Sequence, residues 1–246
     1  MQLVKVSMLI TATIFVMALA VSANAKPLVP ARHGNFKHYV LALTWQPGFC
    51  HNGSCASNQS HNVLIGLHGL WASRPQVLIN RGIKAPQWWH KGCDYFHHSN
   101  RAPNLASETK ARLSKLMPQL SHSLLKHEYD KHVQCFGFGA EAFFSKLIKL
   151  RNDVADSMFG AYLKDHKGKT VSHNKVRAAF TNAFNTAHSD SLQLRCNRQS
   201  GQAVLSQIWV TIHANRLNQF PASASFMNAP IAQDNCPAQF EIPSWN

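Results

Sequence analysis

The stretch His127–Cys135, HEYDKHVQC, places two histidines, a glutamate, a lysine and a cysteine within nine residues. On a helix, residues four apart share a face, so Glu128 lies beside His132, and His127 lies beside Lys131. The spacing differs from the zinc-protease pattern HExxH, because Lys131 stands where the second histidine ligand is needed. The stretch is therefore either a metal-free catalytic cluster or a solvated helix face with a few ion pairs.

A second histidine segment, IGLHGLW at Ile65–Trp71, bears on this choice. It overlaps the apolar run of residues 63–68, and this run predicts a buried strand. His68 stands near Gly66 and Gly69, which leave an imidazole poorly covered for a place in the core. One histidine at a strand end is ordinary. Two such segments in one chain favour a site that combines them.

The N-terminus has the pattern of an export signal. Lys5 precedes the apolar run 8–21, and Ala23-Asn24-Ala25 forms a small-residue cleavage site. We predict a cleaved signal peptide over residues 1–25, one domain over residues 26–246, and a periplasmic or secreted protein. The apolar run is too short to span a membrane, so no membrane span is expected.

The chain is strongly basic, with 25 lysines and arginines against 11 acidic residues and a formal net charge of +14. Such an excess points to a polyanionic partner, which can be nucleic acid, an anionic membrane surface or a polysaccharide. The basic residues are scattered along the chain, which argues against a disordered basic tail. Composition alone does not separate these partners from a protein kept soluble by its charge.

The six cysteines of the chain, an even number in an exported protein, predict three disulfides. Their spacing does not choose among the possible pairings, and the lack of a CxxC motif argues against a zinc ribbon or a thioredoxin-like site.

Hydrophobic periodicity predicts strands first, helices in the middle and strands last, which is typical of an α+β domain. The predicted strands cover residues 39–45, 63–68, 191–196 and 203–213, and the predicted helices cover residues 107–116, 121–135, 141–157 and 172–184. Residues 73–103 contain three prolines and are expected to be irregular.

Taken together, the two histidine segments resemble the active-site segments of the ribonuclease T(2) family, whose usual forms are close to HGLWP and HEWxKHGxC. In this chain they read HGLW at His68–Trp71 and HEYDKHVQC at His127–Cys135. The stretch YVLALTWQPGFC at residues 39–50 resembles the N-terminal strand of the family, and the FGF that follows Cys135 is similar to the bacterial, periplasmic ribonuclease I-like branch. The likeness extends from about Phe36 to Cys236.

The resemblance implies an α+β domain in which helices flank a central antiparallel sheet. It also implies disulfide pairing of Cys50–Cys55, Cys93–Cys135 and Cys196–Cys236. Members of the family are endoribonucleases that need no metal and no cofactor, so none is expected here. Their products are 2′,3′-cyclic phosphate ends and then 3′-phosphates.

Roles for the site residues also follow from the resemblance. His132 is expected to be the general base and His68 the general acid, because an imidazole titrates near neutral pH. Glu128 completes the catalytic set by positioning a proton or tuning His132. Lys131 and His127 are expected to bind the phosphate and the charge that develops on it, and Trp71 in the first segment to contact a base.

The expected substrate is single-stranded RNA, which carries its own nucleophile, the 2′-hydroxyl. DNA lacks this group and should not be cleaved. Ala72-Ser73 follows Trp71 where many members of the family have proline and base-selective members have an acidic residue, so low base specificity is expected. The protein is expected to act as a monomer.

Two alternatives remain open from the sequence. One is an exported basic protein that binds RNA or another polyanion without cleaving it. The other is a phosphodiesterase that acts on small cyclic nucleotides. A further cluster, His90 with His97 and His98, could bind a metal, but a solvated loop is the favoured interpretation.

Overall fold

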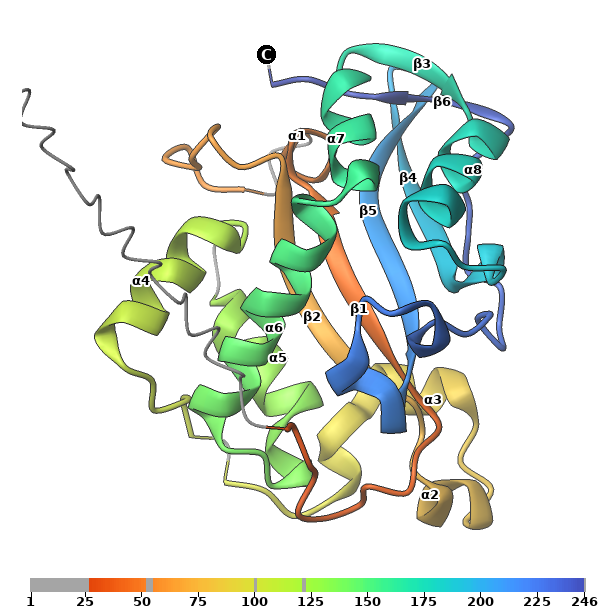
Figure 1. Cartoon of the computed structure of the whole chain (residues 1–246). Helices are drawn as coiled ribbons and strands as arrows, with labels where there is room; N and C mark the ends of the chain where they lie inside the picture. The colour runs from red at the N-terminus through yellow and green to blue at the C-terminus, as the bar shows by residue number, and fades with distance from the viewer. Residues whose placement is uncertain (1–26, 52–54, 100, 121–122, 246) are drawn as a thin grey trace, which may run out of the picture.

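The computed structural model describes residues 27–51, 55–99, 101–120 and 123–245. Within them the chain forms a six-stranded sheet with the strand order β2-β1-β5-β6-β3, and β4 pairs with β5 as well (Figure 1). The predicted signal peptide, residues 1–25, lies outside the described residues.

Most of the helices follow one another in the middle of the chain, between the second and the third strand. The strands are β1 (His38–Trp45), β2 (Ile65–Ala72), β3 (Lys169–Ser172), β4 (Leu192–Gln199), β5 (Gln202–His213) and β6 (Gln239–Ile242). The α-helices are α1 (Gln46–Cys50), α2 (Gln76–Asn80), α3 (Ala85–Lys91), α4 (Ser107–Leu116), α5 (Leu124–His132), α6 (Ala140–Ala155), α7 (Met158–Asp165) and α8 (His173–Phe184). Short 3-10 turns are η1 (Gly92–Tyr95), η2 (Gln134–Phe136), η3 (Ser189–Ser191), η4 (Ala214–Gln219) and η5 (Ser223–Ser225).

The sheet is antiparallel apart from one contact. β1 pairs antiparallel with β2 and with β5, β4 pairs antiparallel with β5, and β3 pairs antiparallel with β6. The exception is β6, which runs parallel to β5 and meets it at Val204 and Glu241. The predicted α+β fold with a central antiparallel sheet is confirmed, and this single pair makes the sheet a mixed one.

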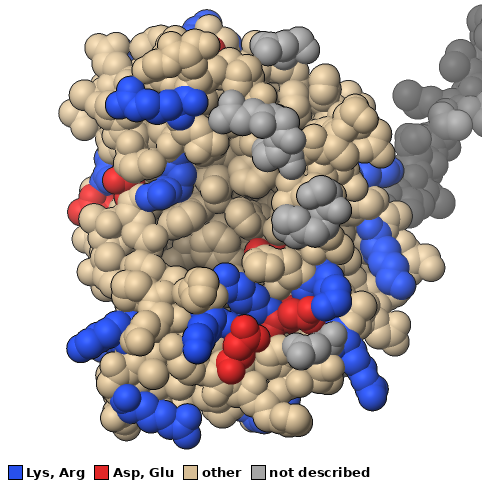
Figure 2. All heavy atoms as spheres, turned by 180° about the vertical axis from the view of Figure 1, so that it is seen from behind, with Lys and Arg blue, Asp and Glu red and all other residues tan. Residues whose placement is uncertain are grey.

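The two faces of the sheet have different neighbours. Helices α4, α5 and α6 contact β2, and α8 contacts β3 near the other end of the sheet (Figure 1). Phe143, Phe144 and Leu147 of α6 are buried, as the helical periodicity of this segment predicts. Seen from the opposite side, the surface has a hollow near its middle, with Lys and Arg side chains around it (Figure 2).

The prediction that residues 73–103 are irregular is wrong. They contain α2, α3 and the turn η1. The prolines start helices here, because a helix needs no backbone N–H from its first residues and a fixed φ suits its first turn. Pro75 immediately precedes α2, and Pro86 lies in the first turn of α3.

Among the other predicted elements, two differ most from the prediction in their boundaries. β2 continues through Ala72 rather than ending at His68, so the HGLW motif lies inside the strand. Helix α5 is shorter than residues 121–135. It begins after Ser123, whose side chain accepts a hydrogen bond from the backbone N–H of Lys126, and it ends at His132. Helix α7 and strands β3 and β6 were not predicted.

Three disulfides are present. Cys50–Cys55 joins cysteines close in the sequence, while Cys93–Cys135 and Cys196–Cys236 join segments far apart in the sequence. These are the pairs that the family resemblance implies. The bond between Cys93 and Cys135 ties η1 to the turn that follows α5, so it fixes the end of the helix that carries HEYDKH. In the described residues, no helix is both long and apolar enough to cross a bilayer.

Candidate active site

His68 reaches the site because β2 bulges at this residue. In the pairing of β1 with β2, Ala42 faces Gly69 and the next residue, Leu43, faces Leu67, so His68 has no partner on β1. An extra residue of this kind bends the strand locally and redirects its side chain, and such bulges are frequent beside active sites. The side chain of His68 remains 18% exposed.

Gly69 has a spatial role that its place in the motif does not reveal. A Cβ atom added there would lie 2.0 Å from Oε2 of Glu128 and 2.5 Å from Nε1 of Trp71. The glycine therefore leaves room for the carboxyl of α5 to reach across the strand. In that space the indole N–H of Trp71 donates a hydrogen bond of 2.6 Å to Oε2 of Glu128.

Glu128 is the buried centre of the site, with 2% of its side chain exposed. Its other oxygen, Oε1, lies 3.6 Å from Nε2 of His68. Burial raises the pKa of Glu128 to about 8, although the hydrogen bond from Trp71 and the charge of Lys131 act in the opposite direction. Glu128 therefore holds a proton at neutral pH, opposite the imidazole of His68.

Both imidazoles of the site lose basicity in the protein. Burial lowers the pKa of His68 to about 4, against a smaller opposite effect of its hydrogen bond to Gln207. Burial also lowers the pKa of His132 well below its ordinary value, and the positive charges of Lys131, His127 and His68 add to the effect. With no anion present, both rings are neutral near pH 7.

The six predicted site residues line one pocket of about 680 Å³. They are His68, Trp71, His127, Glu128, Lys131 and His132. Trp71 stands at the junction: its ring centroid lies 5.2 Å from that of His68 and 5.6 Å from that of His132. Two segments that are about 60 residues apart in the sequence therefore meet around one indole ring.

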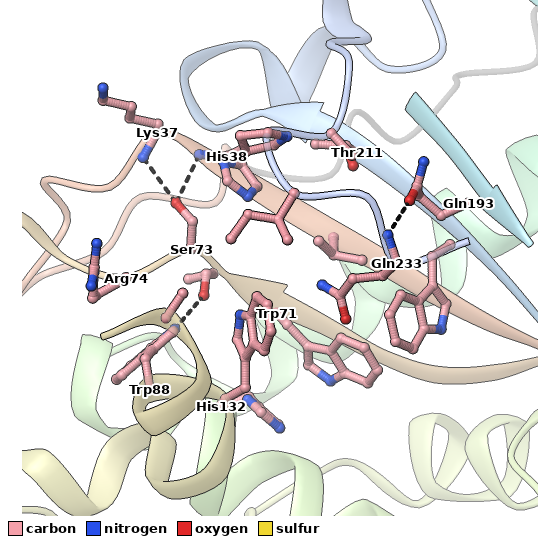
Figure 3. Close-up of a pocket in the computed structure, with 18 of the residues that line it drawn as sticks. Lys37, His38, Trp71, Ser73, Arg74, Trp88, His132, Gln193, Thr211 and Gln233 are labelled. Carbon is pink, nitrogen blue, oxygen red and sulfur yellow. Dashed lines mark hydrogen bonds between the residues drawn. The ribbon is translucent and has the colours of Figure 1, made fainter. Parts of the chain in front are cut away.

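The pocket extends beyond the histidines across the open face of the sheet. In Figure 3, Trp71 lies next to His132, while Lys37, His38 and Ser73 lie together farther along the pocket. Ser73 Oγ accepts the backbone N–H groups of both Lys37 and His38, at 3.1 and 3.2 Å. Glu128 is the only acidic side chain among the described residues that line the pocket.

Sequence reasoning missed the contribution of β5. Gln207 and Trp209 lie on the strand face opposite the buried Ile208 and Val210, and Trp209 lines the pocket. The alternation in β5 predicts that these two side chains share a face. Nothing in the sequence indicates that this face meets His68, because that contact depends on the order β2-β1-β5.

The side-chain donor atoms of His127, Glu128 and His132 lie within 4.8 Å of one another, a spacing that a metal ion could bridge. Two features oppose such binding. One carboxyl oxygen of Glu128 is bound to Trp71, and its raised pKa keeps a proton that a metal would have to displace. The prediction that no metal is needed therefore stays open to experiment.

The other histidine cluster lies outside the pocket. Nε2 of His98 is 3.4 Å from Oδ1 of Asp94, four residues earlier in the chain. His90 and His97 are exposed. None of the three is among the described residues that line the pocket. A local structural role for His98 accounts for these contacts.

Comparison with known sequences agrees with the geometry. Residues 36–226 match the model of the Ribonuclease T2 family. Ribonuclease I of Escherichia coli (strain K12) is 32% identical over 247 aligned positions, which cover 90% of this chain and 91% of that protein. The fold and the site thus define a class of α+β domain in which a strand and a helix each bring a histidine to one pocket. The chain belongs to the Ribonuclease T2 family, as its motifs predict.

Solved structures show the same fold. RNase NT in complex with 5′-AMP matches with a TM-score of 0.59 and 18% identity, over 85% of this chain and 98% of that one. An RNase-related protein from Calystegia sepium matches with a TM-score of 0.60, also at 18% identity, over 85% of this chain and 98% of that one. At 18% identity these two structures are evidence for the fold alone.

Proposed function

We propose that the protein is a metal-independent endoribonuclease that cleaves single-stranded RNA by transphosphorylation, with low base specificity. Its products would be 2′,3′-cyclic phosphate ends and then 3′-phosphates. Membership of the Ribonuclease T2 family supports an endoribonuclease. The observation that carries the proposal is the pocket in which His68 and His132 flank a buried carboxyl, with Lys131 beside them.

In the first step His132 takes the proton of the 2′-hydroxyl, and the freed oxygen attacks the adjacent phosphorus. The bond from phosphorus to the 5′-oxygen breaks as His68 gives that oxygen a proton. In the second step the two histidines exchange roles: His68 accepts a proton from water, the water oxygen opens the cyclic phosphate, and His132 protonates the 2′-oxygen. The lowered pKa of His132 suits the first role, because a base must begin neutral.

The proton that His68 gives away has a source in the site. Glu128 holds a proton at neutral pH, and its Oε1 lies 3.6 Å from Nε2 of His68. A phosphate that enters closer to His68 than to Glu128 raises the pKa of the imidazole more than that of the carboxyl, which favours transfer of the proton from the carboxyl to Nε2. His68 then protonates the 5′-oxygen, and Lys131 and His127 balance the charge on the phosphoryl oxygens.

Binding of RNA is supported by the basic surface and by the shape of the pocket. A formal net charge of +14 attracts the phosphate backbone, with an affinity that falls as salt rises. The partly buried ring of Trp71 offers a surface on which a base can stack. A duplex would hold its bases away from such a pocket, which is why single strands are the proposed substrate. The scarcity of acidic groups along the pocket is consistent with low base specificity.

We also propose that the protein is exported, to the periplasm or outside the cell, and that it acts as a monomer. Three disulfides support an oxidising compartment, because such bonds seldom persist in the cytosol of ordinary cells.

The test is cleavage of four RNA homopolymers in EDTA by the wild type, by His132→Ala and by His166→Ala. His166 bonds the backbone oxygen of Tyr162 and lies outside the pocket, so it controls for loss of a histidine. Mass spectrometry should show cyclic phosphate and 3′-phosphate ends with the wild type and the control, and none with His132→Ala. RNA that is bound but intact would favour a binding protein instead. Turnover of small cyclic nucleotides without cleavage of polymer would favour a phosphodiesterase.

A further inference from the structure

Gln207 contacts the catalytic histidine of the first segment from two strands away. Oε1 of Gln207, on β5, lies 3.0 Å from Nδ1 of His68, on β2, and β1 lies between the two strands. On β1, Thr44 pairs with Gln207 and Ala42 pairs with Gly69, and the bulge in β2 places the unpaired His68 next to Gly69.

A second donor identifies the atom that Gln207 presents. Nε1 of Trp209 lies 3.0 Å from the same Oε1. An indole nitrogen can only donate a hydrogen bond, so the amide atom facing it must be the oxygen. An amide oxygen can only accept, and His68 must therefore carry a proton on Nδ1. This contact leaves Nε2, which faces Glu128 at 3.6 Å, as the atom that exchanges protons.

The position of Trp209 is itself fixed. The guanidinium of Arg195, on the neighbouring strand β4, lies 5.0 Å from the centre of its ring, and the ring of Trp71 meets it edge-on at 5.2 Å. The indole N–H is thus held toward Gln207. An amide that flipped would place its NH₂ group against this N–H and lose that hydrogen bond, so the indole N–H opposes the arrangement in which Gln207 donates to an unprotonated Nδ1 of His68.

We propose that Gln207 is a positioning residue for the reaction, which holds His68 as the Nδ1–H tautomer with Nε2 toward the leaving 5′-oxygen, and that Trp209 locks the amide of Gln207 in place. The inference deepens the proposed ribonuclease function and rests on it. In the transfer step the Nε2–H bond of His68 breaks and an O–H bond forms on the leaving oxygen. The Nδ1–H bond to Gln207 is kept throughout.

The amide of Gln207 is a neutral hydrogen-bond acceptor, which suits His68 because this residue must give up its proton. A carboxylate at this place would hold His68 in the charged form and oppose the transfer. The other titratable groups that face His68 belong to α5: Glu128, His127 and His132. The ring of Phe49, in α1, also contacts His68 in a T-shaped arrangement, with the two ring centroids 5.8 Å apart.

The first experiment reads the tautomer directly, without RNA. Long-range nitrogen–proton correlation spectra of the imidazole rings distinguish Nδ1–H from Nε2–H, and His68→Ala identifies the signals of His68. We expect Nδ1–H in the wild type and a mixture of tautomers in Gln207→Met, which keeps the length of the side chain but has no amide oxygen. A wild type in the Nε2–H form would overturn the proposal.

The second experiment measures turnover. Gln207→Met should lower kcat about 10- to 100-fold with KM changed less than about 3-fold, since loss of a partner that orients a histidine typically has effects of this size. Gln207→Glu keeps an acceptor for both donors and should retain the Nδ1–H signal, while the limb of the pH profile that reports His68 moves to higher pH. Ser206→Ala is the control, because this buried hydroxyl on the same strand bonds the backbone of Arg195 instead. Wild-type kcat and pH profile in Gln207→Met would refute the role of Gln207.

Should Gln207→Met fail to fold, Trp209→Phe supplies an independent test. It leaves Gln207 in place and removes only the N–H that locks its amide, so both tautomers of His68 should become visible and kcat should fall less than in Gln207→Met. A single Nδ1–H tautomer in Trp209→Phe would refute the lock. A wild type that shows the Nδ1–H tautomer but leaves RNA intact would overturn the proposed function instead, so the two failures are distinguishable.

Discussion

Replacing Glu128 with glutamine should remove a pH-dependent loss of stability while it removes a proposed catalytic group. Burial raises the pKa of Glu128 from 4.5 to about 8 in the folded protein. Between these values the folded protein keeps a proton that the unfolded chain has lost, so the free energy of unfolding falls as pH rises. The amide of the Glu128→Gln variant would stay neutral at every pH and could still accept the N–H of Trp71.

The size of the effect is clearest above pH 6.5. The pKa values of His68, His132 and His38 are lowered from 6.5 by burial, so these groups make the protein more stable as pH rises, but only up to about that pH. Their remaining contribution just above that pH is shared by the wild type and Glu128→Gln, so the difference between the two proteins isolates the titration of Glu128. Its slope is about 1.4 kcal/mol per pH unit, which gives a loss on the order of 2 kcal/mol between about pH 6.5 and 8.

The assay is urea unfolding with intact disulfides at three pH values from 6.5 to 8. The wild type should lose about 2 kcal/mol across the interval relative to Glu128→Gln. Glu141→Gln is the matched control, because hydrogen bonds from Thr109 and Ala106 lower the pKa of Glu141 and place its titration below this range. Parallel curves for the wild type and Glu128→Gln would refute the assignment of a proton to buried Glu128.

Three further changes test other parts of the site. Gly69→Ala would drive a Cβ into the carboxyl of Glu128 and should lower kcat about 100-fold, whereas Gly139→Ala, with no neighbour within 4 Å of its added Cβ, should leave kcat unchanged. Lys131→Met should lower kcat/KM for RNA about 100-fold. It should also reduce the slope of log affinity against log salt concentration by about one, and an unchanged slope would contradict the proposed phosphate contact. Replacing Cys93 and Cys135 together with serine should lower the free energy of unfolding by about 2–5 kcal/mol, which denaturant titration would show.

Local patterns in the sequence account for much of the fold. Alternation at Ile208, Val210 and Ile212 predicts β5, and the apolar period around Phe143 and Leu147 predicts α6, because each pattern records which side of one element is buried. The order of strands and helices along the chain is enough to indicate an α+β domain. The short helices after Pro75 and near Pro86 escaped prediction, because a proline that ends one helix can equally begin another.

The candidate site, like the fold, is predicted by the sequence only in part. Spacing alone determines that Glu128 and His132 share a helix face, since it is a property of one turn of backbone. Only the tertiary structure decides that β2 bulges at His68, that Gly69 makes room for the carboxyl of Glu128, and that Gln207 reaches the ring across β1. These features depend on strand register and on distances between segments far apart in the chain, and no pattern within a single segment contains that information.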